Sequence, residues 1–332
     1  MKSYTRKWLW GMLALSATSV WAALPSWEAW VAGVRQEALS QGIRAAVFDE
    51  AFRDIHEPNR QIKRFLKTQP EHRLTYERYL KTRVDAYRLA MGRKNYLKNQ
   101  TLLDQIGREY GVDPCFIVAF WGMETSYGTY MGDFPSIKAL ATLAYDSNRP
   151  AYFKHELLLA LRILNDNQVT LKEFKGEWAG ASGQPQFMPS SWFKYAVDYD
   201  HDGRKNIWTS LPDVFASIAN YMKLNGWQTG EVWALKVTLP PNFDKHLMGK
   251  TIVKPVSAWQ ALGVRLENGQ ALPASALPAS LVQPNEGPVF LALPNYKMIL
   301  KYNNSVYYAG AIGYMPEHVC RGAAEKRRVN ED

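Results

Sequence analysis

Apolar residues recur at helical spacing along most of the first 235 positions. One stripe includes Val34 and Ala38, and another includes Phe153 and Leu157. Residues three or four positions apart lie on the same face of a helix, so each stripe predicts a helix with one buried face. Residues 23–235 are therefore predicted to form a helical domain.

The segment from residue 115 to residue 123 is apolar at almost every position. Asp113 precedes it as a capping side chain, and Pro114 stands where the first helical residue would be. A helix that is apolar all round is buried on every side. We therefore expect a central buried helix that brings Glu124 to its C-terminal end.

Other helix ends are marked by capping residues, prolines and glycines. Ser26 and Pro150 precede apolar stripes, and Gly111 ends one. The sequence Ser210-Leu-Pro-Asp213 resembles a capping box for a helix that ends near residues 225–226.

Residues 236–300 differ in character, because prolines cluster there and helical periodicity fades. Two short apolar runs, 280–282 and 289–293, flank the turn residues 285–287, which predicts a hairpin. A last helix is expected from about Ser305, followed by a polar, frayed tail after Cys320. The predicted fold class is mainly α, with a helical domain at 23–235, a small α/β subdomain at 236–300, and a segment at 301–332 that returns to the helical domain.

The N-terminus has the features of a secretory signal. Lys2, Arg6 and Lys7 precede a mostly apolar stretch, residues 8–20, and small residues precede a cleavage position after Ala22. The alternative is an uncleaved anchor, but the stretch is short for a spanning helix. Beyond it, no apolar stretch is long enough to cross a bilayer. We therefore expect a periplasmic protein with no transmembrane segment in the mature chain.

Composition and charge limit the kinds of partner that the protein can bind. The chain has 332 residues, of which 47% are hydrophobic and 21% are charged, so it is globular rather than disordered. Its formal charge of +9 suits an anionic polymer. The positive residues are scattered and no recognition motif accompanies them, so we expect an acidic cell-envelope polymer and no nucleic acid.

The two cysteines, Cys115 and Cys320, exclude a disulfide-rich scaffold and a four-cysteine zinc site. In an oxidising compartment they could close one long loop. Alternatively they are separate thiols, with Cys115 packed inside an apolar helix, and this is the interpretation that we favour.

Glu124 is the strongest candidate for chemistry. Apolar surroundings and the negative end of a helix dipole both disfavour its charged form and raise its pKa. A carboxyl that stays protonated near neutral pH can act as a general acid in glycosidic cleavage. The alternative is a structural glutamate tied to backbone amides or to an arginine.

Three motifs occur in order: Gly122-Met-Glu-Thr-Ser-Tyr-Gly128, Gly180-Ala-Ser-Gly-Gln-Pro-Gln-Phe-Met-Pro-Ser190 and Tyr302-Asn-Asn-Ser305. Together they resemble the signatures of the lytic murein transglycosylase B family, over roughly residues 30–315. The resemblance implies a lysozyme-like helical fold and cleavage of peptidoglycan glycan strands between N-acetylmuramic acid and N-acetylglucosamine. It also implies that the muramyl 6-hydroxyl attacks C1, giving a 1,6-anhydro product, with Glu124 as the single acid and base and no catalytic cofactor.

The resemblance assigns substrate contacts to five further residues. Gln186 would contact substrate near the catalytic carboxyl, Tyr302 and Asn303 would close the cleft, and Arg149 and Tyr152 would contact sugar and peptide. Structural alternatives are a loop glutamine bonded to the backbone for Gln186 and packing roles for the Tyr-Asn pair.

Glu177 departs from the family pattern, because the best-known members have a serine at this position. We include it among the substrate-site residues, since a carboxylate there changes the polarity around Glu124.

A second candidate site lies in Asp198-Tyr-Asp-His-Asp-Gly203. Aspartates at positions 1, 3 and 5 and glycine at position 6 match the start of an EF-hand loop, and Arg204 would offer its carbonyl oxygen. Position 12 is Thr209 rather than glutamate, so we expect Asp213 to supply the missing carboxylate. We favour a structural calcium or sodium ion over a solvated Asx turn.

Two other functions stay open at this point. One is a hydrolytic muramidase, in which water replaces the 6-hydroxyl. The other is a non-catalytic scaffold that binds peptidoglycan. The expected partners are glycan strands and other cell-wall enzymes, and the expected state is a monomer.

Overall fold

The computed structural model describes residues 24–67 and 74–321. The predicted signal at residues 1–22 and the tail at residues 322–332 lie outside the described part. Within that part, no helix is both long and apolar enough to cross a membrane.

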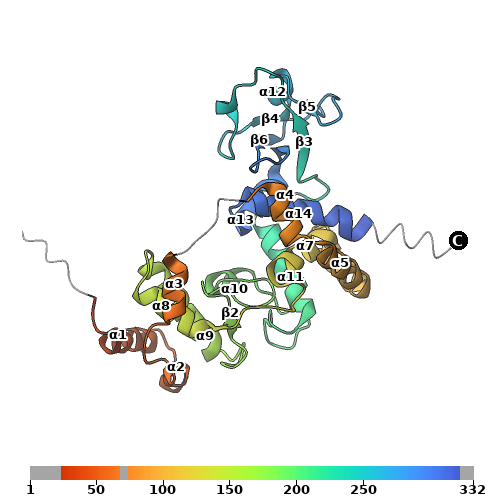
Figure 1. Ribbon diagram of the computed structural model, residues 1–332. Helices are drawn as coiled ribbons and strands as arrows, with labels where there is room; N and C mark the ends of the chain where they lie inside the picture. The colour runs from red at the N-terminus through yellow and green to blue at the C-terminus, as the bar shows by residue number, and fades with distance from the viewer. Residues whose placement is uncertain (1–23, 68–73, 322–332) are drawn as a thin grey trace, which may run out of the picture.

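The first three helices lie on one side of the molecule, and the next two lie on the other (Figure 1). The Ser26 hydroxyl accepts a hydrogen bond from the Ala29 N–H at 3.2 Å, which confirms the predicted first cap. The elements of this part are α1 (Trp27–Ser40), α2 (Ala45–Phe52), α3 (Arg60–Lys67), α4 (Tyr76–Arg83), α5 (Ala86–Lys98) and α6 (Gln100–Tyr110).

Helix α7 (Pro114–Thr125) is the buried centre of the helical body, as its apolar sequence predicts. The Asp113 carboxylate caps it by accepting the Cys115 N–H at 2.8 Å. Every side chain from Phe116 to Trp121 is buried. Because α5, α6, α11 and α14 all contact α7, its position and that of Glu124 are set by the whole helical body.

The middle of the chain adds helices that contribute many further core residues. These are α8 (Ser136–Tyr145), α9 (Pro150–Asn165), α10 (Pro189–Tyr195) and α11 (Leu211–Leu224), with a two-stranded antiparallel ribbon of β1 (Phe134–Pro135) and β2 (Lys175–Gly176). Helix α11 begins where predicted, but the capping-box interpretation was wrong. The Ser210 side chain makes no capping bond, because its hydroxyl donates to Asp200 at 2.6 Å instead.

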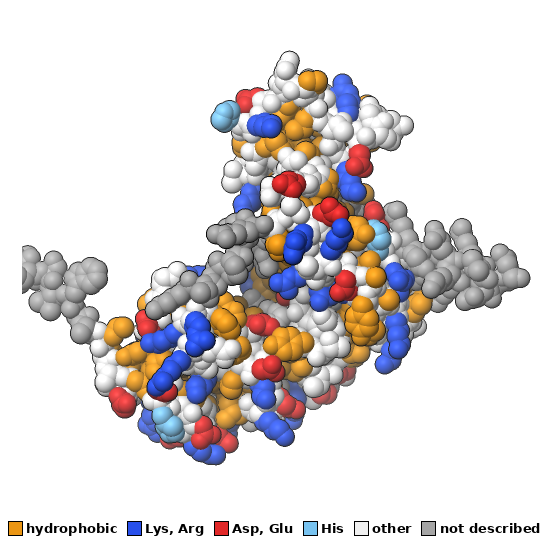
Figure 2. Space-filling view, viewed as in Figure 1, with side chains coloured by type: hydrophobic (Ala, Val, Ile, Leu, Met, Phe, Trp, Pro, Cys, Tyr) orange, Lys and Arg blue, Asp and Glu red, His pale blue; other side chains and the backbone are white. Residues whose placement is uncertain are grey.

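A small antiparallel sheet (Figure 1) forms a lobe that projects from the helical body (Figure 2). Its strand order is β4-β6-β7-β3-β5, from β3 (Ala234–Thr238), β4 (Lys254–Pro255), β5 (Arg265–Leu266), β6 (Pro278–Val282) and β7 (Val289–Ala292). The 3-10 turn η1 (Lys245–Leu247) and helix α12 (Val256–Ala261) complete it. Strands β6 and β7 pair with Leu281 opposite Leu291, which confirms the predicted hairpin. Trp259 is fully buried in the lobe's own apolar cluster.

The chain then returns to the helical body through α13 (Pro294–Tyr302), α14 (Val306–Pro316) and the π-helical turn η2 (Glu317–Arg321). The last helix begins where predicted, and the Ser305 side chain caps it. Helix α13 was not predicted, because we took Pro294 as part of the proline-rich stretch. In the structure that proline is the first residue of a helix, where its missing N–H is not needed.

A disulfide joins Cys115 to Cys320, so the expectation of separate thiols was wrong. Cys115 lies in the first turn of α7, at the edge of the buried segment rather than inside it. Helix α14 packs along α7 and leads into η2, which carries Cys320 back to that edge. Sequence spacing could not show this, because the two residues are 205 positions apart.

Candidate active site

Glu124 is the penultimate residue of α7 and is half-buried. Burial raises its pKa from 4.5 to about 7, partly offset by a hydrogen bond from Tyr308 and reinforced by the negative charge of Glu177. At neutral pH such a carboxyl is present in both protonation states. It can therefore give up a proton and take one back in the same reaction.

The Tyr308 hydroxyl donates a hydrogen bond to Oε1 of Glu124. Tyr308 lies in the first turn of α14 and is buried, 184 residues away from Glu124 in the sequence. Sequence analysis missed this residue. The only local signal was the cap at Ser305, which places Tyr308 in the first turn of the last helix.

Tyr302, at the end of α13, lies beside these two groups. Its hydroxyl donates to the Pro185 carbonyl oxygen, and its ring packs on those of Phe120 and Tyr221, with ring centroids 4.6 and 4.5 Å away. Burial and the nearby Glu124 hold the pKa of Tyr302 well above 10. Tyr302 is therefore neutral, and aromatic packing holds its ring in place near Glu124.

The end of α7 has an unusual backbone. Ser126 and Tyr127 both adopt left-handed conformations, with φ of 49° and 64°. Such residues cost about 1–3 kcal/mol each and persist where the surroundings over-determine them. Here Tyr127 is locked by a hydrogen bond to the Arg88 carbonyl at 2.9 Å and by packing against Gly122, where a Cβ would come within 2.6 Å of the Tyr127 ring.

Residues 182–187 form a tight loop that is bonded to α7 beside Glu124. The Trp121 indole N–H donates to the Gln184 side-chain oxygen at 2.6 Å, and the Thr125 hydroxyl donates to the Gln184 carbonyl at 3.0 Å. The Gln184 amide in turn donates to the Trp208 carbonyl at 2.9 Å. Sequence analysis did not single out Gln184, although its buried amide connects this loop to α7.

Gln186 stands at the tip of that loop in a left-handed conformation, with φ of 52°. Its side-chain N–H group donates to the carbonyls of Gly183 and Met131 at 2.8 and 3.1 Å. Its buried side-chain oxygen has no hydrogen-bond partner among the described residues. A buried acceptor without a hydrogen-bond partner costs free energy.

Glu177 follows β2 and is close enough to Glu124 to raise its pKa. Burial and the neighbouring Asp133 raise the pKa of Glu177 itself, while Arg83 lowers it. Asp133 and Glu177 also raise the pKa of Tyr130. The surroundings of Glu124 are therefore acidic on the side of Glu177 and Asp133.

The remaining predicted contact residues are not joined to Glu124 by any contact within residues 24–67 and 74–321. The Arg149 guanidinium lies 4.1 Å from the centre of the Tyr152 ring at the start of α9. Asn303 is exposed at the end of α13, and its backbone N–H bonds to Ile299 at 3.2 Å. These three residues keep their predicted roles as proposals.

The aspartate loop has the predicted shape. Carboxylate oxygens of Asp198, Asp200 and Asp202 lie within 4.8 Å of one another. Backbone N–H groups orient these carboxylates, for example the Gly203 N–H, which donates to Asp198 at 3.0 Å. Asp213 lies beside the cluster and is fully buried.

Asp213 holds the loop backbone. Its carboxylate accepts N–H groups of Tyr199 and Asn206, both at 2.7 Å, and of Asp200 at 3.4 Å. Burial raises the pKa of Asp213 against the effect of these bonds.

Glu124 thus combines a pKa near neutrality with a tyrosine hydrogen-bond donor, next to a loop that holds an unpartnered glutamine oxygen, in a mainly helical, lysozyme-like protein. Residues 26–317 match the model of the transglycosylase SLT domain. The chain belongs to this family, which confirms the resemblance to lytic murein transglycosylases of type B.

Solved structures with the same fold include ligand complexes. SltB3 from Pseudomonas aeruginosa, in complex with NAG-anhNAM-pentapeptide, superimposes with a TM-score of 0.84 at 42% identity, covering 88% of this chain and 79% of that one. Escherichia coli Slt35, in complex with calcium, has a TM-score of 0.78 at 29% identity, covering 89% and 93%.

A curated relative is the membrane-bound lytic murein transglycosylase B of Escherichia coli K12. It is 36% identical over 227 residues, which cover 65% of this chain and 60% of the relative. The match thus spans about three fifths of that relative's length.

Proposed function

We propose that the protein is a lytic transglycosylase that cleaves the β-1,4 bond between N-acetylmuramic acid and N-acetylglucosamine in peptidoglycan. The observation that carries the proposal is the half-buried Glu124, whose pKa is raised to about 7 by burial. Membership of the transglycosylase SLT family supports it. So does the SltB3 complex with an anhydromuramyl ligand, which resembles the product of this reaction.

In the first step, the protonated Glu124 donates its proton to the glycosidic oxygen as the bond from that oxygen to C1 breaks. The N-acetylglucosamine leaves with that oxygen as its 4-hydroxyl. The muramyl 6-hydroxyl oxygen then bonds to C1, and its proton passes to the Glu124 carboxylate. The enzyme returns to its initial state and no water is consumed, so a second catalytic carboxylate is not required.

The surrounding residues would position the substrate. The unpartnered Gln186 oxygen would accept a hydrogen bond from a sugar hydroxyl or acetamido N–H. Tyr302 would form one wall of the site, and Asn303, Arg149, Tyr152 and Glu177 would lie further along the glycan or its peptide.

Product analysis tests this function. Purified peptidoglycan sacculi are treated with the protein or with Glu124→Gln, and the soluble products are identified by mass spectrometry. We expect anhydromuropeptides from the wild type and none from the variant. Products with reducing ends would instead indicate a hydrolase, and binding without products would indicate a scaffold.

We also propose that the loop from Asp198 to Arg204 binds calcium. Three carboxylates within 4.8 Å repel one another unless a cation lies between them, and their oxygens are ligands that calcium prefers. Slt35, which shares the fold, was crystallised with calcium. The Arg204 carbonyl oxygen would be the last ligand that the loop itself supplies. We retain the predicted role of Asp213 as a ligand, and its carboxylate also orders the loop backbone.

Thermal unfolding with and without calcium tests this site. At a calcium concentration of about 100 times the dissociation constant, binding stabilises the native state by about 2.7 kcal/mol. We expect the melting temperature to rise with calcium in the wild type and to stay constant in Asp202→Asn. A rise of equal size in both proteins would contradict the assignment.

We further propose that the protein acts in the periplasm, as its predicted signal at residues 1–22 and its envelope substrate imply. Cell fractionation of a tagged protein tests this location, and its presence in the cytoplasm would contradict it. Other cell-wall enzymes remain the expected partners, and a monomer the expected state.

A further inference from the structure

A cavity of about 320 Å³ lies at the opposite end of α7 from Glu124. Phe116 lines it, and a helix rises 1.5 Å per residue, so the cavity and Glu124 are separated by roughly 12 Å along the helix axis. The volume is within the range of small-ligand sites. This cavity is therefore distinct from the proposed catalytic cleft.

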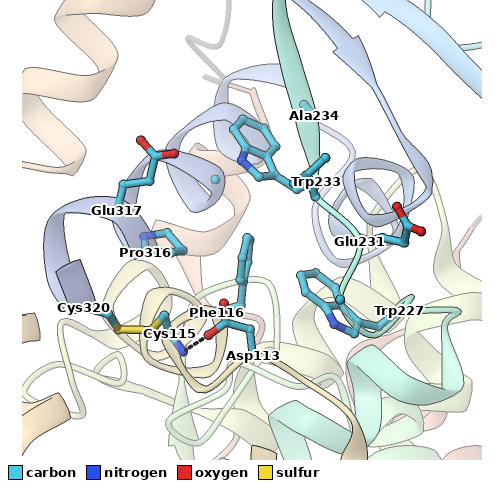
Figure 3. A pocket seen from close by; sticks show the side chains of 13 residues that line it. Asp113, Cys115, Phe116, Trp227, Glu231, Trp233, Ala234, Pro316, Glu317 and Cys320 are labelled. Carbon is cyan, nitrogen blue, oxygen red and sulfur yellow. Dashed lines mark hydrogen bonds between the residues drawn. A yellow bond between two sulfur atoms is a disulfide. The ribbon is translucent and has the colours of Figure 1, made fainter. Parts of the chain in front are cut away.

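Three aromatic rings gather around the cavity from different parts of the chain (Figure 3). Phe116 comes from α7, Trp227 from the loop after α11, and Trp233 from the residue before β3. The Phe116 and Trp227 ring centroids are 4.7 Å apart. Trp233 lies flat against Tyr296, at 5.5 Å and an angle of 10°. Packing therefore holds these walls in place.

The loop that carries the acidic side of the cavity is also fixed. The fully buried Asn295 accepts the Gln228 N–H at 2.7 Å and donates to the carbonyls of Gln228 and Glu231 at 2.9 and 2.8 Å. The Thr229 hydroxyl donates to the Gly111 carbonyl at 2.7 Å. A site whose walls are ordered in advance loses less entropy on binding.

The charges around the cavity have one sign. Glu231 and Glu317 lie on opposite sides of it, and Asp113 lies at its base (Figure 3). The described lining contains no lysine, arginine or histidine, although the chain has 40 lysines and arginines. In the described structure, the side chains of Glu231 and Glu317 have no hydrogen-bond or ion-pair partner.

The side chains that line the cavity favour some classes of ligand over others. An anion would be repelled by the carboxylates. For a sugar, the described lining offers only the indole N–H groups of Trp227 and Trp233 as side-chain donors, and it contains no hydroxyl or carboxamide side chain. An ammonium group is attracted both to a carboxylate and to the face of a tryptophan ring. Val232 and Pro316 offer apolar contact for an alkyl stem.

We propose that this cavity is a second binding site, for a peptide that presents an ammonium group on an alkyl side chain, as lysine and other diamino acids do. The ammonium group lies at the acidic rim of the cavity, to which Glu231 and Glu317 belong, and its alkyl stem packs on Trp227 and Trp233. The site is independent of Glu124 chemistry.

Two matched probes test the site: Nα-acetyl-lysine methylamide and its norleucine analogue, which lacks the ammonium group. Binding is followed through the indole N–H signals of Trp227 and Trp233 in NMR spectra, assigned with Trp→Phe variants. We expect the lysine probe to bind with a dissociation constant of about 1–10 mM, at least about tenfold more tightly than the norleucine probe.

The variant Glu231→Gln/Glu317→Gln should weaken lysine-probe binding at least about tenfold. The control Glu28→Gln/Glu267→Gln removes the same charge from exposed positions and should bind like the wild type. Anhydromuropeptide release should be equal in all three proteins, so failure of this site is distinguishable from failure of the catalytic proposal.

Three results would overturn the proposal: equal affinity for both probes, no saturable change in the indole signals, or equal losses in the two double variants. Binding seen only after deletion of residues 322–332 would also overturn it. That result would mean that the chain's own basic residues, Lys326, Arg327 and Arg328, compete for the cavity, and the external peptide would not be its ligand.

Discussion

The change Tyr308→Phe isolates one contact of the proposed acid. It removes the hydroxyl that donates to the Glu124 carboxylate and leaves the buried ring in place. This hydrogen bond lowers the pKa of Glu124 against the larger effect of burial, which sets it at about 7. Without the bond, the carboxylate loses stabilisation and the protonated form is favoured.

The expected size of the pKa change follows from the type of hydrogen bond that is lost. A hydrogen bond to a charged group contributes about 1.5–3 kcal/mol, and about 1.4 kcal/mol corresponds to a factor of ten in an equilibrium constant. Losing the bond should raise the proton affinity of Glu124 about tenfold to a hundredfold. Because the first step needs the protonated acid, the wild-type activity should fall as pH rises through about 7. In Tyr308→Phe this fall should move to higher pH.

The assay is release of anhydromuropeptides, measured as kcat/KM across pH. Tyr307→Phe is a matched control, because its hydroxyl donates to the Leu74 carbonyl at 3.2 Å and does not contact Glu124. We expect the control to keep the wild-type profile. An unchanged alkaline limb in Tyr308→Phe, or the same shift in the control, would refute the argument that this bond tunes the acid.

Three further predictions concern the same molecule. In Glu177→Gln, loss of the nearby negative charge should lower the pKa of Glu124 and move the fall in activity to lower pH, opposite to Tyr308→Phe; an unchanged pH profile would contradict it. Because the pKa of Glu124 is raised from 4.5 to about 7, its ionisation destabilises the fold above pH 7 by about 3 kcal/mol and has no effect below about pH 4.5. Urea unfolding should therefore show Glu124→Gln to be more stable than the wild type at pH 8 but not at pH 4, and equal stability at both would count against the burial argument. Replacing Cys115 and Cys320 by serine should lower the free energy of unfolding by about 2–5 kcal/mol, because the disulfide closes a loop with a sequence separation of 205. Urea unfolding of the variant and the oxidised wild type measures this difference, and equal midpoints would show that the bridge contributes nothing to stability.

The local sequence was sufficient to predict the helices and strands whose formation depends on residues that are neighbours in the chain. The apolar run after Asp113 and Pro114 predicted the buried helix that carries Glu124, because uniform apolarity leaves no face for solvent. The turn residues around Asn285 predicted the β6–β7 hairpin. Helix α13 was missed because a proline that begins a helix and a proline in a loop look alike without their surroundings.

The same limit applies to the candidate site. Glu124 could be singled out because burial and a helix end act locally on its pKa. Its partner Tyr308 could not, because their contact spans 184 residues and forms only when α14 packs along α7. The pairing of Cys115 with Cys320 depends on the same packing. The sequence thus determined that Glu124 lies at the end of an apolar helix. Only the tertiary structure decided which distant groups contact that helix, because hydrogen bonds and disulfides require atoms within a few ångströms of one another.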